Sequence, residues 1–151
     1  MNVHPIDPSA SCFLLGAKRS NLDRWGVFAL ESIPAGRKVI EYGGERLTYR
    51  QARARFAKTW KPHGTKRFYF AKLDDKWVID GAVGGTGAEL INHSCEPNLS
   101  ARRIRGHLVY FSRRAIRRGE EVTLDYRFAK TAPRVTCRCG SKKCRGTLNV
   151  F

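Results

Sequence analysis

Three cysteines in the last fifteen residues of the sequence have the spacing of metal ligands. Cys137, Cys139 and Cys144 form the pattern C-x-C-x4-C within eight residues. In a reducing compartment, clustered thiols are metal ligands more often than disulfide partners, and tetrahedral zinc takes four thiolate or imidazole ligands. The run supplies three ligands, so the fourth has to come from Cys95, from Cys12 or from a histidine. The spacing therefore predicts a zinc site and leaves its fourth ligand open.

The residues around these cysteines also favour metal binding. Basic neighbours favour the thiolate form that binds zinc; here they are Arg138, Lys142, Lys143 and Arg145. Gly140 and Gly146 allow the backbone to turn tightly around an ion. The alternative is a tail with three unligated thiols, and the reactivity of exposed thiols at this density argues against it.

Two other segments carry side chains that are able to do chemistry. One is the polar run Asn92-His93-Ser94-Cys95-Glu96-Pro97-Asn98, and the other is the strand-like run 120–126, which ends in a tyrosine. Taken alone, His93 is interpreted as a hydrogen-bonded core histidine and Tyr126 as a packing residue at a strand end. The glycine-rich stretch 81–87 has neither a P-loop lysine nor the pattern G-x-G-x-x-G, so we expect no phosphate site there.

Short apolar runs between glycine and proline turns predict the elements that position these residues. Strands are expected at 12–15, 25–30, 38–42, 68–73, 77–80, 108–111 and 121–126, and a short helical turn at 88–92. One helix is predicted over 48–60, where Tyr49, Ala52, Phe56 and Trp60 recur at helical spacing and form a core-packing stripe. Thr48 is a suitable cap for its start. Many short strands with few helices predict a β-rich fold.

There is a faint internal repeat in the strand pattern. The spacing of Phe28, Ile33, Gly36 and Val39 recurs in Phe111, Ile116, Gly119 and Val122. Both segments predict a strand, a glycine turn and a second strand. Two copies of so loose a pattern can also arise by chance, and no solenoid period is present.

The charge balance indicates an anionic partner. The 151 residues include 29 Lys and Arg against 13 Asp and Glu, for a formal net charge of +16. Such a charge suits nucleic acid or a nucleoprotein, and the alternative is a solvated basic surface without a specific partner. A basic surface repels a free basic peptide, so a lysine-rich substrate requires a local acidic or carbonyl-lined groove.

Length and hydropathy define the class of protein. The length favours one domain, and 42% hydrophobic residues with scattered aromatics predict a globular protein that we expect to be a monomer. No apolar run is long enough for a membrane span, and the first residues do not resemble a signal peptide. We therefore expect an intracellular protein without membrane contact, in a compartment, cytoplasmic or nuclear, that the sequence does not distinguish.

Four segments, in order along the chain, resemble the SET-domain protein-lysine N-methyltransferase family. The run 92–98 resembles the central signature of the family, and Glu120-Glu121-Val122-Thr123-Leu124-Asp125-Tyr126 resembles its second signature. The C-terminal run Cys137-x-Cys139-x4-Cys144-Arg145-Gly146 is similar to the post-SET module, and Trp25-Gly26-Val27-Phe28 to the N-terminal cofactor strand. The resemblance covers about residues 12–151. It implies an N-terminal arm at 1–11, a SET domain at 12–128 and a post-SET zinc-binding segment at 129–151.

The resemblance implies S-adenosylmethionine as methyl donor and the side-chain amine of a protein lysine as acceptor. The cofactor residues that it implies are Arg24, Trp25, Gly26, Tyr69, Asn92, His93 and Leu148. Arg24 stands where the family usually has glycine, so this loop is expected to differ. The implied fold is a set of small curved sheets with knot-like threading of the C-terminal segment.

The resemblance also assigns catalytic and metal-binding roles. Tyr126 is the implied catalytic tyrosine, and Tyr42 is expected to line the same lysine channel. Cys95 is the implied fourth zinc ligand, beside the three cysteines of the C-terminal run, which leaves Cys12 as an expected buried structural thiol. The competing hypothesis is a non-enzymatic, zinc-stabilised basic module that binds nucleic acid or chromatin, although such a module has no need of the Tyr126 hydroxyl.

Overall fold

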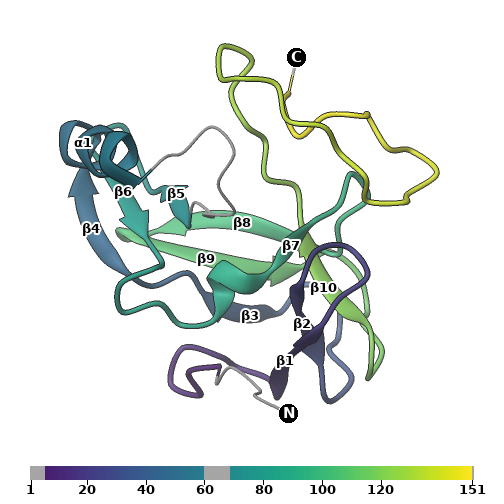
Figure 1. The fold of residues 1–151 in the computed structure, drawn as a ribbon. Helices are drawn as coiled ribbons and strands as arrows, with labels where there is room; N and C mark the ends of the chain where they lie inside the picture. Colours follow the sequence, from purple (N-terminus) through teal and green to yellow (C-terminus); the bar gives the residue numbers. More distant parts are fainter. Residues whose placement is uncertain (1–5, 60–68, 151) are drawn as a thin grey trace.

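The strands of the protein form three small sheets that enclose one core (Figure 1). A computed structural model describes residues 6–59 and 69–150. Within these ranges the chain forms ten short strands, one α-helix and one 3-10 turn, which confirms the expected β-rich fold. No helix in the described part of the chain is long and apolar enough to cross a membrane.

The four-stranded sheet carries the segments that resemble cofactor and catalytic signatures. Its order is β1-β2-β10-β7, and its strands are β1 (Leu15–Arg19), β2 (Trp25–Ala29), β10 (Glu121–Leu124) and β7 (Asn92–His93). β10 pairs antiparallel with β2 and parallel with β7, where Thr123 is opposite Asn92 and Leu124 is opposite His93. This register places Asn92 and His93 beside the end of β10, and Tyr126 follows β10 two residues later.

Two three-stranded sheets complete the fold. One has the order β3-β9-β8, with β3 (Lys38–Glu41), β9 (His107–Ser112) and β8 (Leu99–Ile104). The other has the order β4-β6-β5, with β4 (Glu45–Thr48), β6 (Trp77–Asp80) and β5 (Phe70–Lys72). β4 and β8 were not expected from the sequence, because β4 contains one apolar residue and the alternation in β8 is broken at Arg102-Arg103. Their pairing with β6 and β9 along the whole strand decides their conformation.

Helix α1 (Tyr49–Thr59) begins directly after the expected cap. The Thr48 hydroxyl accepts the Gln51 backbone N–H at 3.2 Å, and the Gln51 side chain accepts the Thr48 N–H at 2.8 Å, which makes a capping box. Tyr49 and Ala52 pack in a small cluster over the sheet of β4, as the stripe predicts. Phe56 is 39% exposed, so the buried stripe ends before it, and Trp60 lies outside the described residues. The expected helical turn is the 3-10 turn η1 (Ala88–Leu90).

The internal repeat corresponds to a two-fold arrangement in the structure. Ile33 and Ile116, both 1% exposed, exchange two backbone hydrogen bonds of 2.8 Å. The flanking hydrogen bonds also join equivalent positions of the two copies. Gly36 N–H donates to the Ser112 carbonyl at 2.8 Å, and Gly119 N–H donates to the Ala29 carbonyl at 2.7 Å. Both glycines have positive φ, +74° and +90°, which favours glycine at these turns. The repeat in the sequence is therefore a structural unit that packs against its own copy.

The core lies between the sheets and fixes the strands that lead to the polar segments. Val27 and Val122 are fully buried at the centre of the β2–β10 pair. Ile91, 3% exposed, holds the backbone directly before Asn92. After β10 the chain forms a long loop segment beyond the ends of β7 and β10 (yellow in Figure 1), which is held by bridges and side chains and contains no strand among its described residues.

Candidate active site and metal centre

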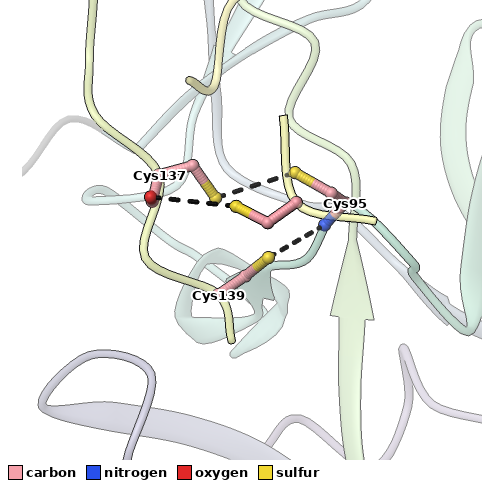
Figure 2. Close-up of side chains that lie close together, drawn as sticks. Cys95, Cys137 and Cys139 are labelled. Carbon is pink, nitrogen blue, oxygen red and sulfur yellow. Dashed lines mark hydrogen bonds between the residues drawn. The ribbon is translucent and has the colours of Figure 1, made fainter. Parts of the chain in front are cut away.

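Four cysteines from two distant parts of the chain converge at the base of the C-terminal segment. The Sγ atoms of Cys95, Cys137, Cys139 and Cys144 all lie within 4.8 Å of one another, and Figure 2 shows the sulfurs pointing toward a common centre. The Cys95 and Cys137 Sγ atoms are 3.7 Å apart. A tetrahedral zinc ion with Zn–S bonds of about 2.3 Å requires sulfurs about 3.8 Å apart, so donor type, number and spacing fit zinc.

Backbone N–H groups point at these sulfurs. Arg145 N–H donates to Cys95 Sγ at 3.3 Å, Gly146 N–H to Cys144 Sγ at 3.4 Å and Cys95 N–H to Cys139 Sγ at 3.5 Å. Burial raises the pKa of Cys139, but the donated hydrogen bonds outweigh this effect and hold its pKa below the usual value. Burial raises the pKa of Cys95 and Cys137. One thiol of the cluster is therefore prepared to ionise, and a nearby cation would favour the thiolate form of Cys95 and Cys137.

Asn92 joins the loop between β1 and β2 to the sheet. Its side-chain amide donates to the Trp25 carbonyl at 2.8 Å, to the Asp23 carbonyl at 3.2 Å and to the Glu121 carboxylate at 2.8 Å. The Ser20 hydroxyl donates to the same carboxylate at 2.8 and 2.9 Å. The expected cofactor residues of this loop and of β7 thus lie together, tied by a carboxylate that the sequence analysis had not singled out.

Two backbone features shape this loop. A Cβ atom at Gly26 would lie 2.1 Å from Glu121 Oε1, so a side chain there would displace the carboxylate that holds the loop. Arg24 has φ +21°, in the range that favours glycine, at the position where the resemblance expects glycine. Arg24 therefore has a backbone conformation that is more common for glycine.

His93 lies between Tyr126 and the cysteine cluster. Its Nδ1 accepts the Tyr126 backbone N–H at 3.1 Å, and its Nε2 is 3.3 Å from Cys95 Sγ. Burial lowers the pKa of His93, although Asp125 acts in the opposite direction. A neutral ring that accepts at Nδ1 carries its proton on Nε2, so it donates toward the sulfur.

Tyr126 follows β10 and is fixed on three sides. Its hydroxyl donates to the Ile91 carbonyl at 2.6 Å, its ring stacks on Phe128 with centroids 5.8 Å apart, and His93 contacts the ring edge-on at 5.3 Å. The side chain is 37% exposed. The hydroxyl oxygen thus has a fixed position, and a phenolic hydroxyl is by its chemistry both a donor and an acceptor.

A second group of tyrosines lies close to Tyr126. Tyr42, 6% exposed, donates its hydroxyl hydrogen bond to the Tyr69 carbonyl, and its ring lies 6.0 Å from that of Tyr110. Burial, followed by the neighbouring Tyr110, raises the pKa of Tyr42, so this hydroxyl stays neutral. The expected residues Tyr42 and Tyr69 are thus in contact. Tyr110 was expected only as a strand residue, because nothing in its local pattern distinguishes it from other buried strand residues.

An ion pair connects the cysteine cluster to the strand end. The Arg145 guanidinium binds the Asp125 carboxylate with two hydrogen bonds of 2.8 and 2.9 Å. The same side chain donates to the Leu148 carbonyl at 3.4 Å, and Phe128 N–H donates to that carbonyl at 3.1 Å. Burial raises the pKa of Asp125, but the hydrogen bonds from Arg145 hold it below the usual range. Leu148, an expected cofactor residue, is therefore held next to the residues that follow Tyr126.

Buried polar residues hold the rest of the C-terminal segment. The Asn149 side chain donates to the Ala129 carbonyl at 3.0 Å and accepts the Val135 N–H at 3.0 Å and the Thr147 hydroxyl at 2.9 Å. This role of Asn149 has no local sequence signal, because its partners lie up to 20 residues away.

The expectation for Cys12 was wrong. The structure places Cys12 at an exposed position before β1, outside the four-thiol cluster. Its backbone N–H donates to the Val39 carbonyl at 2.9 Å, so the residue is fixed by its main chain while its side chain faces solvent.

Comparison with known proteins identifies a related family. A family model for the SET domain matches residues 24–127. The histone-lysine N-methyltransferase set-2 of Caenorhabditis elegans is 38% identical over 135 residues, which are 87% of this chain and 9% of that protein. The histone-lysine N-methyltransferase trithorax of Drosophila melanogaster is 38% identical over 141 residues, which are 89% of this chain and 4% of that protein.

A human relative gives a similar match. The histone-lysine N-methyltransferase SETD1B of Homo sapiens is 38% identical over 135 residues, which are 87% of this chain and 7% of that protein. The chain therefore spans less than a tenth of the length of these three relatives, while the matched region covers most of the chain itself.

Proposed function

The chain belongs to the SET-domain family, and from this premise we propose that it transfers a methyl group from S-adenosylmethionine to the side-chain amine of a protein lysine. The observation that carries the proposal is the convergence of the Asn92–His93 strand, Tyr126 and the C-terminal segment at one end of β10. The relatives are named histone-lysine N-methyltransferases. A histone or another basic protein is therefore the proposed substrate class.

Residues at this end of the sheet are proposed to bind the cofactor. When bound, S-adenosylmethionine supplies an electrophilic methyl group on a sulfonium. The loop Arg24–Gly26 and the strand Asn92–His93 are held against each other by the Asn92 amide, so their backbone groups form a fixed surface. Leu148 approaches from the C-terminal segment, and we include Tyr69 through its contact with Tyr42.

The acceptor amine has to be neutral before it attacks. A lysine with a pKa near 10.4 requires about 4.6 kcal/mol to be neutral at pH 7. Removal from water disfavours the ammonium form, and the buried, uncharged hydroxyl of Tyr42 is proposed to line such an environment.

Tyr126 is proposed to orient the amine. Its hydroxyl proton is directed to the Ile91 carbonyl, which fixes the oxygen, and this oxygen is proposed to accept a hydrogen bond from the amine and so to orient the nitrogen lone pair. We assign this residue to orientation and electrostatics, since most of the rate in such a site comes from alignment.

The four cysteines are proposed to hold one structural zinc ion. Cys95 lies on the segment that follows Asn92–His93, and the other three ligands lie in the C-terminal run. Zinc bound here ties residues 129–151 to residues 12–128, which we propose as the post-SET segment and the SET domain, with an N-terminal arm at 1–11. The metal would act as a clamp that completes the cofactor side of the site, with no part in the methyl transfer itself.

The non-enzymatic alternative receives no support from the relatives, which are named as enzymes. A nucleic-acid contact through the basic surface is compatible with the enzymatic proposal, because most of the exposed Lys and Arg residues lie outside the residues assigned here.

Calorimetry with S-adenosylmethionine tests the proposal at the level of binding. Zinc-loaded, folded protein is expected to bind the cofactor at one site per chain, and S-adenosylhomocysteine is expected to compete. The Tyr126→Phe variant should bind equally well, since its hydroxyl contacts the amine rather than the cofactor. A complete lack of binding by the zinc-loaded protein would rule out the enzymatic function.

A further inference from the structure

The two loops of the internal repeat bring basic residues together at the start of β10. The Arg37 N–H donates to the Ser112 hydroxyl at 2.9 Å, and Ser112 N–H donates to the Arg37 carbonyl at 2.9 Å, beside the Ile33–Ile116 bridge. We define the basic loop surface as the exposed basic residues of both loops, which are Arg37, Lys38, Arg113, Arg114, Arg117 and Arg118. The same loops contain two acidic residues, Glu31 and Glu120.

Few of these basic side chains are engaged by the protein. Arg114 pairs with Glu120 at 2.9 Å, and its side chain is still 56% exposed. Arg113 reaches the Pro97 carbonyl at 3.4 Å, and the Arg37 guanidinium lies 5.6 Å from the Phe13 ring centroid. In the part of the chain that the structure describes, the other three residues of the surface have no carboxylate within 4.0 Å.

Several arginines elsewhere have structural partners. Arg55 binds Glu45 and Asp80 and so fixes helix α1 to its sheet. Arg103 donates to the Lys72 carbonyl at 2.8 Å, and Arg102 lies 4.3 Å from the Phe111 ring centroid. These side chains hold elements together, whereas the basic loop surface gathers six exposed basic residues on two segments that backbone hydrogen bonds hold side by side.

We propose that the basic loop surface binds the phosphate backbone of double-stranded DNA. Arginine is suited to this task because its planar guanidinium donates two parallel hydrogen bonds to a phosphate. The loops are held rigidly by backbone hydrogen bonds, which suits a stiff duplex. Residues 30–38 and 113–120 include no aromatic residue, so they offer no platform for the base stacking on which single-strand binding depends.

The surface is separated from the proposed catalytic residues. Residue 120 precedes β10 directly and Tyr126 follows its end, so a strand of four residues, about 13 Å long, lies between them. In Figure 1 these loops and the C-terminal segment leave opposite ends of β10. DNA on the basic loop surface therefore leaves the Tyr126 end accessible.

Bound DNA would also offset a repulsion that the charge creates. A protein of net charge +16 repels a lysine-rich substrate, and a shared DNA molecule would hold both on one polyanion. This consequence rests on the proposed methyl transfer, whereas the binding itself does not.

A pair of matched variants tests the surface. The first is Arg113→Gln, Arg117→Gln and Arg118→Gln, and the control is Arg50→Gln, Arg53→Gln and Lys58→Gln on the exposed side of helix α1. Each lowers the net charge by three, from +16 to +13. Affinity for a short labelled duplex is measured by fluorescence anisotropy over a range of salt concentrations, without cofactor or substrate, and melting curves establish that both variants fold.

The loop variant is expected to bind the duplex at least about tenfold more weakly at moderate salt. The magnitude of the slope of log K against log salt concentration should fall by about 2 to 3, because each phosphate contact contributes about 0.9 to it. The α1 variant should retain most of the wild-type slope. Equal losses in both variants would show that the charge acts diffusely and would overturn the assignment of the surface. Wild-type protein that does not bind duplex, or binds single strands or polyglutamate as tightly, would overturn the proposed partner.

A second measurement addresses the consequence for methyl transfer. Added duplex should lower the KM of the wild-type protein for a basic protein substrate and leave the loop variant unchanged, while a short peptide substrate is methylated equally by both. Duplex binding with no effect on KM would show that DNA does not hold enzyme and substrate together, and it would leave the proposed binding surface intact. Failure of the methyl transfer itself would leave the anisotropy result unaffected.

Discussion

Tyr126 is the residue on which the proposed chemistry depends. Three contacts fix it: a hydrogen bond of 2.6 Å to the Ile91 carbonyl, a backbone bond to His93, and stacking on Phe128. A tyrosine that served only to pack a strand end would not need its hydroxyl held in this way while more than a third of the side chain faces solvent. The geometry therefore favours a hydroxyl with a directed role.

Replacement of Tyr126 by Phe separates this role from folding. Methyl transfer is expected to fall by about 10²- to 10³-fold, the range typical of removing one oriented polar group from a catalytic site. Stability should fall by only about 1 kcal/mol, because one hydrogen bond to a carbonyl is lost. Initial rates with labelled cofactor and a melting curve measure the two effects, and a variant that methylates at the full rate would exclude the mechanism but not the family.

His93 and Cys12 show what the local sequence predicts about single residues and what it does not. His93 was interpretable alone as a hydrogen-bonded core histidine, and it is one, with partners at both ring nitrogens. Cys12 was expected to be a buried structural thiol because the resemblance implied Cys95 as the fourth zinc ligand, and it is exposed. The difference arises because its neighbour Ser11 pairs with Ile40 at the edge of the fold, a contact that no local pattern predicts.

At the scale of elements, the pair Arg145–Asp125 joins the C-terminal segment to the end of β10. Two hydrogen bonds of 2.8 and 2.9 Å connect the side chains, and the Arg145 backbone N–H also donates to Cys95 Sγ. Among the residues that the structure describes, Arg145 Nε is buried without a hydrogen-bond partner, and the other guanidinium nitrogens bind Asp125 and the Leu148 carbonyl. We infer that this residue positions Leu148 and the cysteine run relative to Tyr126.

The Arg145→Lys variant keeps the charge and loses the two-bond geometry. Amides in residues 129–150 are expected to exchange hydrogen about tenfold faster, because a charged hydrogen bond contributes about 1.5–3 kcal/mol and one of two is lost. Arg114→Lys at the exposed pair with Glu120 is the control and should leave exchange unchanged. Mass spectrometry of exchanged peptides makes the comparison, and equal exchange in the wild type and Arg145→Lys would remove the positioning role.

Elements with a regular local pattern were predictable, and elements that depend on partners were not. Helix α1 followed from its spacing and its Thr48 cap, and β2 and β6 from compact apolar runs. β8 was missed because the alternation in Leu99-Ser-Ala-Arg-Arg-Ile is short and breaks at Arg103, and its residues pair one by one with β9. The internal repeat was visible in the spacing, whereas its two-fold packing required knowledge of which backbone groups face one another.

At the scale of the whole molecule, Cys95 connects two regions that are far apart in the sequence. It lies two residues after His93 and shares its sulfur cluster with cysteines more than 40 positions later. The C-terminal segment contains no described strand, so bound metal, the Arg145 pair and buried Asn149 hold it in place. The zinc ion is therefore expected to control order in this segment more than in the sheets.

The Cys95→Ser variant is expected to lose order in the C-terminal segment and to keep it in the sheets. Zinc content should fall well below one ion per chain, and amides of the C-terminal segment should lose protection, while β2 and β10 keep theirs because their core valines are untouched. Cys12→Ser is the matched control and should keep its zinc, since Cys12 lies outside the cluster. Metal analysis and hydrogen exchange provide the readouts, and unchanged zinc in Cys95→Ser would show that the fourth ligand was placed wrongly.

The site as a whole was predictable as a family pattern and not as a set of contacts. The cysteine spacing indicated three ligands and left the fourth open, and the structure brings Cys95 to the other three sulfurs. Glu121, Asp125 and Arg145 organise the site through side-chain bonds across 20 to 101 residues of sequence. Such long-range pairs have no local signal, so Arg145 was expected only to favour the thiolate form of its neighbours, and no role was expected for Glu121 or Asp125.

The decisive experiment for the proposed methyl transfer is labelling of whole-cell protein with methyl-labelled S-adenosylmethionine, followed by mapping of the modified side chains. Label is expected on lysine side chains of basic proteins, dependent on zinc-loaded enzyme and nearly abolished in Tyr126→Phe. Zinc-loaded, folded protein that leaves lysines unlabelled across the whole extract would contradict the proposed methyl transfer.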